Sequence, residues 1–61
     1  MSLIESYRAQ AAAQREAAAR TNLPNRRMLH ERSALTWEAM AASAEDTAQR
    51  AEVNEAAKAQ R

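Results

Sequence analysis

The sequence predicts an all-α fold: an antiparallel helical hairpin with a longer second helix, expected to dimerise into a four-helix arrangement. The first observation is composition, because alanine supplies 17 of the 61 residues and glycine is absent, which favours helix strongly. The second is that the few large side chains recur at steps of three and four. The third is the single proline, Pro24, which divides the chain into two helical segments. We therefore expect one domain over residues 1–61.

The first helix is predicted over about residues 3–20. Ser2 and Glu5 have the spacing of a capping box, which satisfies free amides at a helix start. From there one stripe follows helical periodicity and tapers to alanine. It consists of Leu3, Ile4, Tyr7, Ala11, Gln14 and Ala18.

A turn is predicted at residues 21–24, followed by a second helix over about residues 25–58. Pro24 lacks an amide hydrogen and disfavours helix in the residue before it, so it suits the opening of a helix after a short turn. The main stripe of the second helix contains Leu23, His30, Ala34, Trp37, Ala41, Ala44, Ala48 and Ala51, flanked by Leu29 and Met40. Folding back at the turn places Tyr7 opposite Ala39 and Met40, and Ala11 opposite Leu35. The expected hairpin core is Leu3, Tyr7, Ala11, Trp37 and Met40.

Self-association is the expected means of completing the fold. A chain of 61 residues buries little apolar surface by itself. The absence of cysteine excludes a disulfide, and one histidine without thiolates excludes a structural zinc site. No cofactor or metal is expected. A second apolar set on the long helix (Met28, Leu35, Ala39, Ala42 and Val53) implies a further contact, because a hairpin has one inner face. The expected oligomer interface is Ala41, Ala44, Ala48, Ala51, Leu35 and Val53.

Charge is distributed unevenly along the chain. Residues 1–32 contain six arginines and three glutamates, a net charge of +3, whereas residues 33–61 contain five acids and three bases, a net charge of −2. An antiparallel homodimer would lay each acidic tail beside the basic hinge of the other copy. The alternative is a hairpin whose binding partner is a different helical protein.

A cytoplasmic location is expected. The first eight residues have neither the basic nor the apolar region of a signal peptide. No apolar run approaches the roughly 20 residues that cross a bilayer. Membrane binding is not expected, because alanine contributes little insertion energy.

Catalysis is not expected from the sequence. His30 is the only histidine, and no serine or cysteine lies where it could be activated. We interpret His30 as closing one end of the apolar stripe. Trp37 is interpreted as the largest core side chain, and its indole N–H needs a partner such as Gln14 or Ser33.

Four arginines cluster around the predicted turn: Arg20, Arg26, Arg27 and Arg32. They are the candidate contacts for an anion or a nucleic acid, so a small dimeric nucleic-acid-binding or regulatory protein is the alternative function. The net charge of +1 favours a solvated hinge or a dock for the acidic tail instead. The primary expectation is a small helical module for protein–protein interaction.

Two resemblances involve the turn. The run Leu23-Pro24-Asn25-Arg26-Arg27 resembles a short signature of GGDEF-type diguanylate cyclase domains, but a chain without glycine lacks their nucleotide-binding motif. The order of Tyr7 to Ala19, then Leu23-Pro24-Asn25, then Glu31 to Ala41 is similar to short uncharacterised alphaproteobacterial proteins. Those proteins have two alanine-rich helices joined by a turn, with a tryptophan in the second helix. This resemblance implies a helical hairpin and no particular activity.

Overall fold

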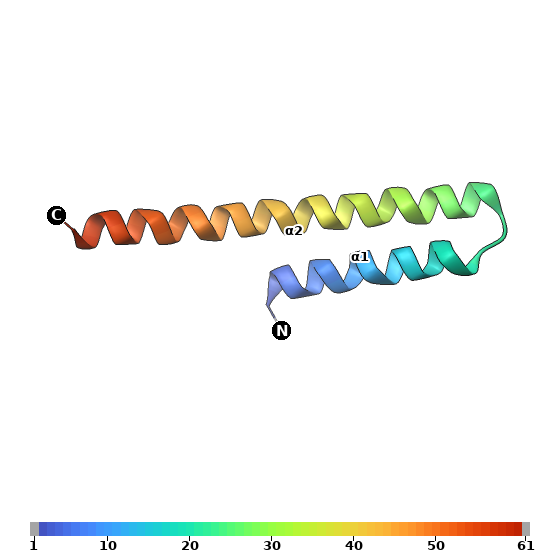
Figure 1. Cartoon of the computed structure of the whole chain (residues 1–61), viewed down its shortest axis with the longest axis horizontal. Helices are drawn as coiled ribbons and strands as arrows, with labels where there is room; N and C mark the ends of the chain where they lie inside the picture. The colour runs from blue at the N-terminus through green and yellow to red at the C-terminus, as the bar shows by residue number, and fades with distance from the viewer. Residues whose placement is uncertain (1, 61) are drawn as a thin grey trace.

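The structure, a computed structural model that describes residues 2–60, is a hairpin of two helices. Helix α1 is Leu3–Arg20, with 18 residues, and helix α2 is Pro24–Ala59, with 36 residues. The helices run antiparallel and pack side by side (Figure 1). The all-helical prediction and the contact between two helices are confirmed. In residues 2–60, neither helix has the length and apolarity to cross a membrane.

Local interactions define where each helix begins. The Ser2 hydroxyl accepts a hydrogen bond from the Glu5 amide at 3.1 Å, which satisfies one of the free amides at the start of α1. In the turn, the Leu23 amide donates to the Thr21 hydroxyl at 3.2 Å. Pro24 then opens α2, and the Arg27 amide donates to the Leu23 carbonyl at 3.0 Å. The two helices are therefore joined by three residues, and α2 starts one residue earlier than expected.

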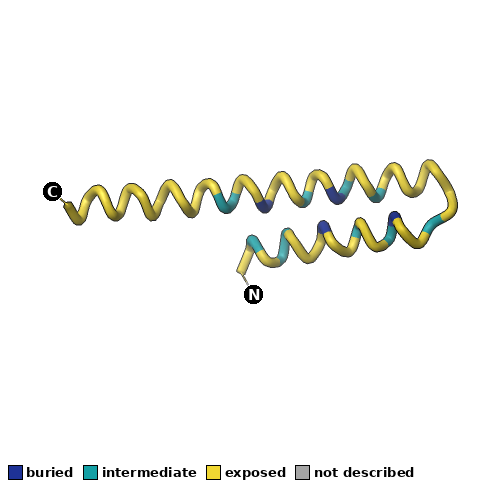
Figure 2. The backbone as a smooth tube through the Cα atoms, viewed as in Figure 1, coloured by how far each residue is buried: buried dark blue, intermediate teal, exposed yellow. Residues whose placement is uncertain are grey.

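The core of the hairpin consists of alanine methyl groups. The buried residues are Ala11 and Ala18 of α1 and Ala34 and Ala41 of α2, each at most 5% exposed. In both helices the two alanines lie seven residues apart, which is two helical turns, so they face the same way. Figure 2 shows these positions on the facing sides of the helices. Small side chains along this seam allow the two backbones to approach closely.

The carboxyl-terminal part of the long helix has no neighbour among the described residues. The amino terminus of α1 lies beside the middle of α2, and α2 continues beyond it (Figure 1). We call residues 46–60 the overhang. Every residue of the overhang is exposed, as the uniform colour of that segment in Figure 2 shows. The hairpin is therefore thin and elongated, with extents of 58 × 19 × 10 Å.

Three predicted assignments are wrong for the folded chain. Leu3 was expected in the core but is 61% exposed, because Ile4 takes the inward position in the first turn of α1. Met40 was also expected there but is 38% exposed at the edge of the seam. Ala41 was expected at an oligomer interface but is 4% exposed, since α1 already covers it.

Candidate functional site

One side of the seam between the helices carries a pair of aromatic rings and a polar pair. The ring centroids of Tyr7 and Trp37 lie 5.8 Å apart with a tilt of 38° between the planes. The polar pair is Gln14, seven residues after Tyr7 on α1, and His30, seven residues before Trp37 on α2. His30 Nδ1 lies 2.8 Å from Gln14 Oε1. Tyr7 therefore faces Trp37 rather than Ala39 and Met40. Gln14, expected to pair with the indole, is the partner of His30.

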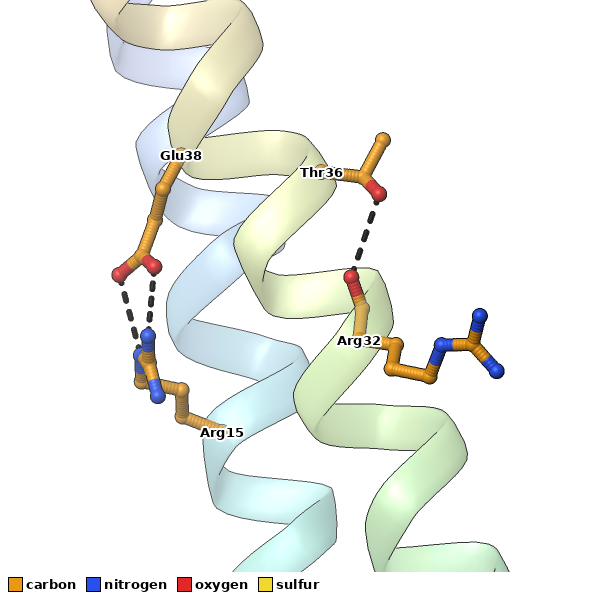
Figure 3. Close-up of polar contacts among 4 residues, drawn as sticks. All are labelled: Arg15, Arg32, Thr36 and Glu38. Carbon is orange, nitrogen blue, oxygen red and sulfur yellow. Dashed lines mark hydrogen bonds and ion pairs between the residues drawn. The ribbon is translucent and has the colours of Figure 1, made fainter.

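The other side of the seam carries two ion pairs. The Arg15 guanidinium donates twice to the Glu38 carboxylate, from Nε to Oε2 at 3.0 Å and from Nη2 to Oε1 at 2.5 Å (Figure 3). The second ion pair joins Arg8, seven residues before Arg15, to Glu45, seven residues after Glu38. On α1 the arginine of each ion pair follows Tyr7 or Gln14 by one residue, or 100° of rotation, so the two kinds of contact flank the alanine seam.

The ion pair between Arg15 and Glu38 changes the pKa of both groups. The hydrogen bonds from Arg15 lower the pKa of Glu38 below its ordinary value, and the charge of Arg15 adds to this against partial desolvation. The pKa of Arg15 is raised, mainly by the hydrogen bond to Glu38 and to a lesser extent by the negative charge of Glu38. Both side chains remain about half exposed, so water screens the attraction. The pair chiefly sets the register of the helices.

The buried alanines and the ion pairs together form a repeated docking unit. On α1 the unit is an arginine followed three residues later by a buried alanine, as in Arg8 with Ala11 and Arg15 with Ala18. On α2 it is a buried alanine followed four residues later by a glutamate, as in the two segments 34–38 and 41–45. Sequence reasoning missed this repeat. The signal was present as glutamates at intervals of seven: Glu31, Glu38, Glu45 and Glu52.

A shallow groove of about 440 Å³ runs along the ion-paired side of the seam. Alanines from both helices form its floor, and the two ion pairs line its edges. The two glutamates among its lining residues are each engaged by an arginine in an ion pair. Within residues 2–60, no three acidic, histidine or cysteine side chains lie close enough to hold a metal ion.

The outer face of α2 lies away from the alanine seam and carries three large apolar side chains, with the charged Asp46 between the last two. We define it by Met28, Leu35 and Val53, which are 55%, 60% and 66% exposed. Ala39 and Ala42 lie between them and are also exposed, and Ala42 at the edge of this face also lines the groove beside α1. Single exposed apolar residues are common on protein surfaces, but a row of them on one helix face is typical of an interaction surface.

The four hinge arginines do not converge on one point. Arg20 donates to Glu16 within α1 at 2.6 Å, and Arg27 donates to the Thr21 carbonyl at 3.0 Å. Arg26 lines a second shallow groove that also contains Arg20. Arg32 points away from α1, and its carbonyl accepts a hydrogen bond from the Thr36 hydroxyl (Figure 3). Arg20 and Arg26 of the predicted cluster thus share one groove, whereas Arg32 points elsewhere.

The alanines predicted at the oligomer interface differ in their surroundings. Ala44 is half-buried at the end of the covered part of α2, whereas Ala48 and Ala51 are exposed on the overhang. All three continue the face of α2 that packs on α1.

Comparisons with known proteins find no match to this chain. A scan against models of known protein families gives no match, and searches among curated proteins and among solved structures give none.

Proposed function

We propose that this chain is a helical module for protein–protein interaction that self-associates into a homodimer through the outer face of α2. The observation that carries the proposal is the exposure of Met28, Leu35 and Val53, at 55% to 66%, on a face that α1 does not reach. Burying such a row against another helix removes apolar surface from water, which is the main driving force for association.

The small core of the hairpin supports the need for a partner. The buried side chains of residues 2–60 are four alanines, and every larger apolar side chain keeps part of its surface in water. A long helix draws most of its stability from packing rather than from intrinsic propensity. A single hairpin with an alanine core therefore gains stability from a second packed surface.

Spacing and charge favour a second copy as the occupant of the outer face. Met28, Leu35 and Ala42 follow one another at intervals of seven, the period of helices that pack along their length. The net charges of +3 for residues 1–32 and −2 for residues 33–61 are complementary in an antiparallel pair. Two hairpins joined in this way through α2 form a four-helix arrangement with a two-fold axis.

Helical content measured at decreasing protein concentration tests the proposal, because association and folding are linked by mass action. We expect Leu35→Gln to shift the loss of helix to a higher protein concentration. Leu29→Gln is the matched control, since Leu29 is 63% exposed but lies on a different face of α2. Equal effects of the two substitutions, or helix content independent of concentration, would refute self-association through this face.

A further inference from the structure

One broad side of the hairpin, over residues 3–17 of α1 and 29–47 of α2, carries no aspartate, glutamate, lysine or arginine. It is the side of the seam on which the rings of Tyr7 and Trp37 lie. On α2 a row at alternating steps of four and three follows it: Leu29, Ser33, Thr36, Met40, Ser43 and Thr47. On α1 the matching row, at intervals of seven, is Leu3, Gln10 and Ala17. We call this surface the uncharged side.

The charged residues of the same two stretches lie elsewhere on the helices. The two ion pairs bridge the helices on the opposite side of the seam. Figure 3 shows Thr36 and Glu38 extending from opposite sides of α2. The other charged residues, such as Glu16, Arg32 and Asp46, occupy the outer faces or the ion-paired side by their helical positions. Because charged groups are costly to remove from water, the uncharged side is the one whose burial costs least.

Three large apolar side chains of the uncharged side are exposed: Leu3 at 61%, Leu29 at 63% and Met40 at 38%. Leu3 and Met40 lie one turn beyond the facing aromatic rings and therefore share one end of this side, whereas Leu29 lies toward the hinge. Two neighbouring helices present ridges of side chains between which those of a third helix pack. With a width of 19 Å and a length of about 25 Å, such a contact buries about 1,000 Å² over both partners, the lower limit for a specific interface.

We propose that the uncharged side binds an amphipathic helix of another protein, whose apolar row is flanked by uncharged residues. A flanking charge on the partner would lose water here without meeting an opposite charge. The net charges of +3 and −2 that favour a second copy at the outer face contribute nothing on this side. The proposal names a partner for the interaction module proposed above and rests on that role, but it uses a different side of α2 from self-association.

The test is a fluorescence titration of the full chain with a synthetic helix, because Trp37 is the only tryptophan. The peptide is as long as α1, lacks aromatic residues, and carries leucine at alternating third and fourth positions. Glutamine and serine flank the leucines, and lysine occupies the far face. We expect a saturable shift of the Trp37 emission to shorter wavelength as the peptide covers the indole. A second peptide with glutamate in place of the flanking glutamines should bind about tenfold more weakly.

Two substitutions of one type compare the two surfaces of α2. Leu29 and Leu35 are 63% and 60% exposed, the first on the uncharged side and the second on the outer face. We expect Leu29→Gln to weaken peptide binding about fivefold and Leu35→Gln to leave it unchanged. Both are measured at a protein concentration at which circular dichroism shows full helical content. Loss of self-association in Leu35→Gln alone, with loss of peptide binding in Leu29→Gln alone, keeps the two proposals separate.

Four results would overturn the proposal. The first is the absence of a saturable shift, and the second is an equal effect of the two substitutions on peptide binding. The third is a change in sedimentation of Leu29→Gln without peptide, because a second copy would then cover the uncharged side. The fourth is faster hydrogen exchange throughout α1 when the peptide is added, because the peptide would then have replaced α1.

Discussion

Arg15 of α1 and Glu38 of α2 hold the two helices together with a pair of hydrogen bonds at 3.0 and 2.5 Å, although 23 positions separate them in sequence. Two parallel bonds between a guanidinium and a carboxylate fix both distance and orientation. With Arg8 and Glu45 repeating the contact two turns away, the sliding of α1 along α2 is restricted. The register of the hairpin therefore depends on long-range polar contacts as well as on the three-residue turn.

The first prediction concerns acid. Because the pKa of Glu38 is below its ordinary value of 4.5 in the folded chain, protonation favours the unfolded chain. The stabilising contribution of Glu38 is complete above that ordinary value and is lost as the pH falls through the lowered pKa. We expect Glu38→Gln to lower the unfolding midpoint at neutral pH and to have no effect at the acid end of a titration.

The control for this titration is Glu55→Gln, which removes the same charge from the overhang, far from α1. Thermal unfolding followed by circular dichroism at one protein concentration gives both midpoints. A difference between Glu38→Gln and the unmodified chain that persists in acid would contradict the assigned role of the pair.

The second prediction concerns the alanine seam. Ala34 is fully buried, at 0% exposure, between the two backbones. Ala34→Leu adds three carbon atoms where no space exists, so we expect a loss of about 1–3 kcal/mol in the free energy of unfolding. Ala57→Leu makes the same change on an exposed position and should stay within about 0.5 kcal/mol of the unmodified chain. Chemical denaturation measures both, and similar values for the two variants would rule out close packing at Ala34.

The third prediction concerns the aromatic pair. Tyr7→Ala removes the ring that lies 5.8 Å from Trp37 and should cost about 0.5–1.5 kcal/mol beyond the lost apolar area. The fluorescence emission of Trp37 should move to longer wavelength as the indole gains contact with water. Leu3→Ala should leave the emission unchanged, since Leu3 is 61% exposed. Unaltered emission in Tyr7→Ala would show that the two rings are not in contact.

The fourth prediction concerns the start of α1. Ser2→Ala removes the acceptor of the hydrogen bond from the Glu5 amide and should cost about 1 kcal/mol. Hydrogen exchange at the Glu5 amide should accelerate, while exchange in the middle of α2 stays slow. Ser2→Asp supplies another acceptor together with a favourable charge, so it should keep exchange slow. Equal exchange in Ser2→Ala and the unmodified chain would mean that Ser2 does not cap α1.

Helix positions could be predicted because local signals determine them. Ser2 and Pro24 act through their own backbone and immediate neighbours, and alanine favours helix wherever it stands. The pairing of Tyr7 with the second helix followed from the position of the turn, although its neighbour is Trp37. The all-helical hairpin could therefore be derived before any tertiary contact was known.

The division of residues between inner and outer surfaces could not be predicted in the same way. Ala41 and Ala48 have the same residue type and lie on the same face, yet α1 covers only Ala41. Which alanine is covered depends on the register, and the register depends on Arg8 and Arg15 meeting glutamates far along the chain. Their pattern at intervals of seven was visible in the sequence, but its meaning required the other helix in place.

Sedimentation equilibrium of the unmodified chain over a wide concentration range is the most direct test of the claim that the outer face of α2 binds a second copy. The account predicts a particle of about twice the chain mass of 6.8 kDa that dissociates on dilution and loses helix as it does so. A particle of 6.8 kDa at the highest concentration, with its helical content intact, would contradict it.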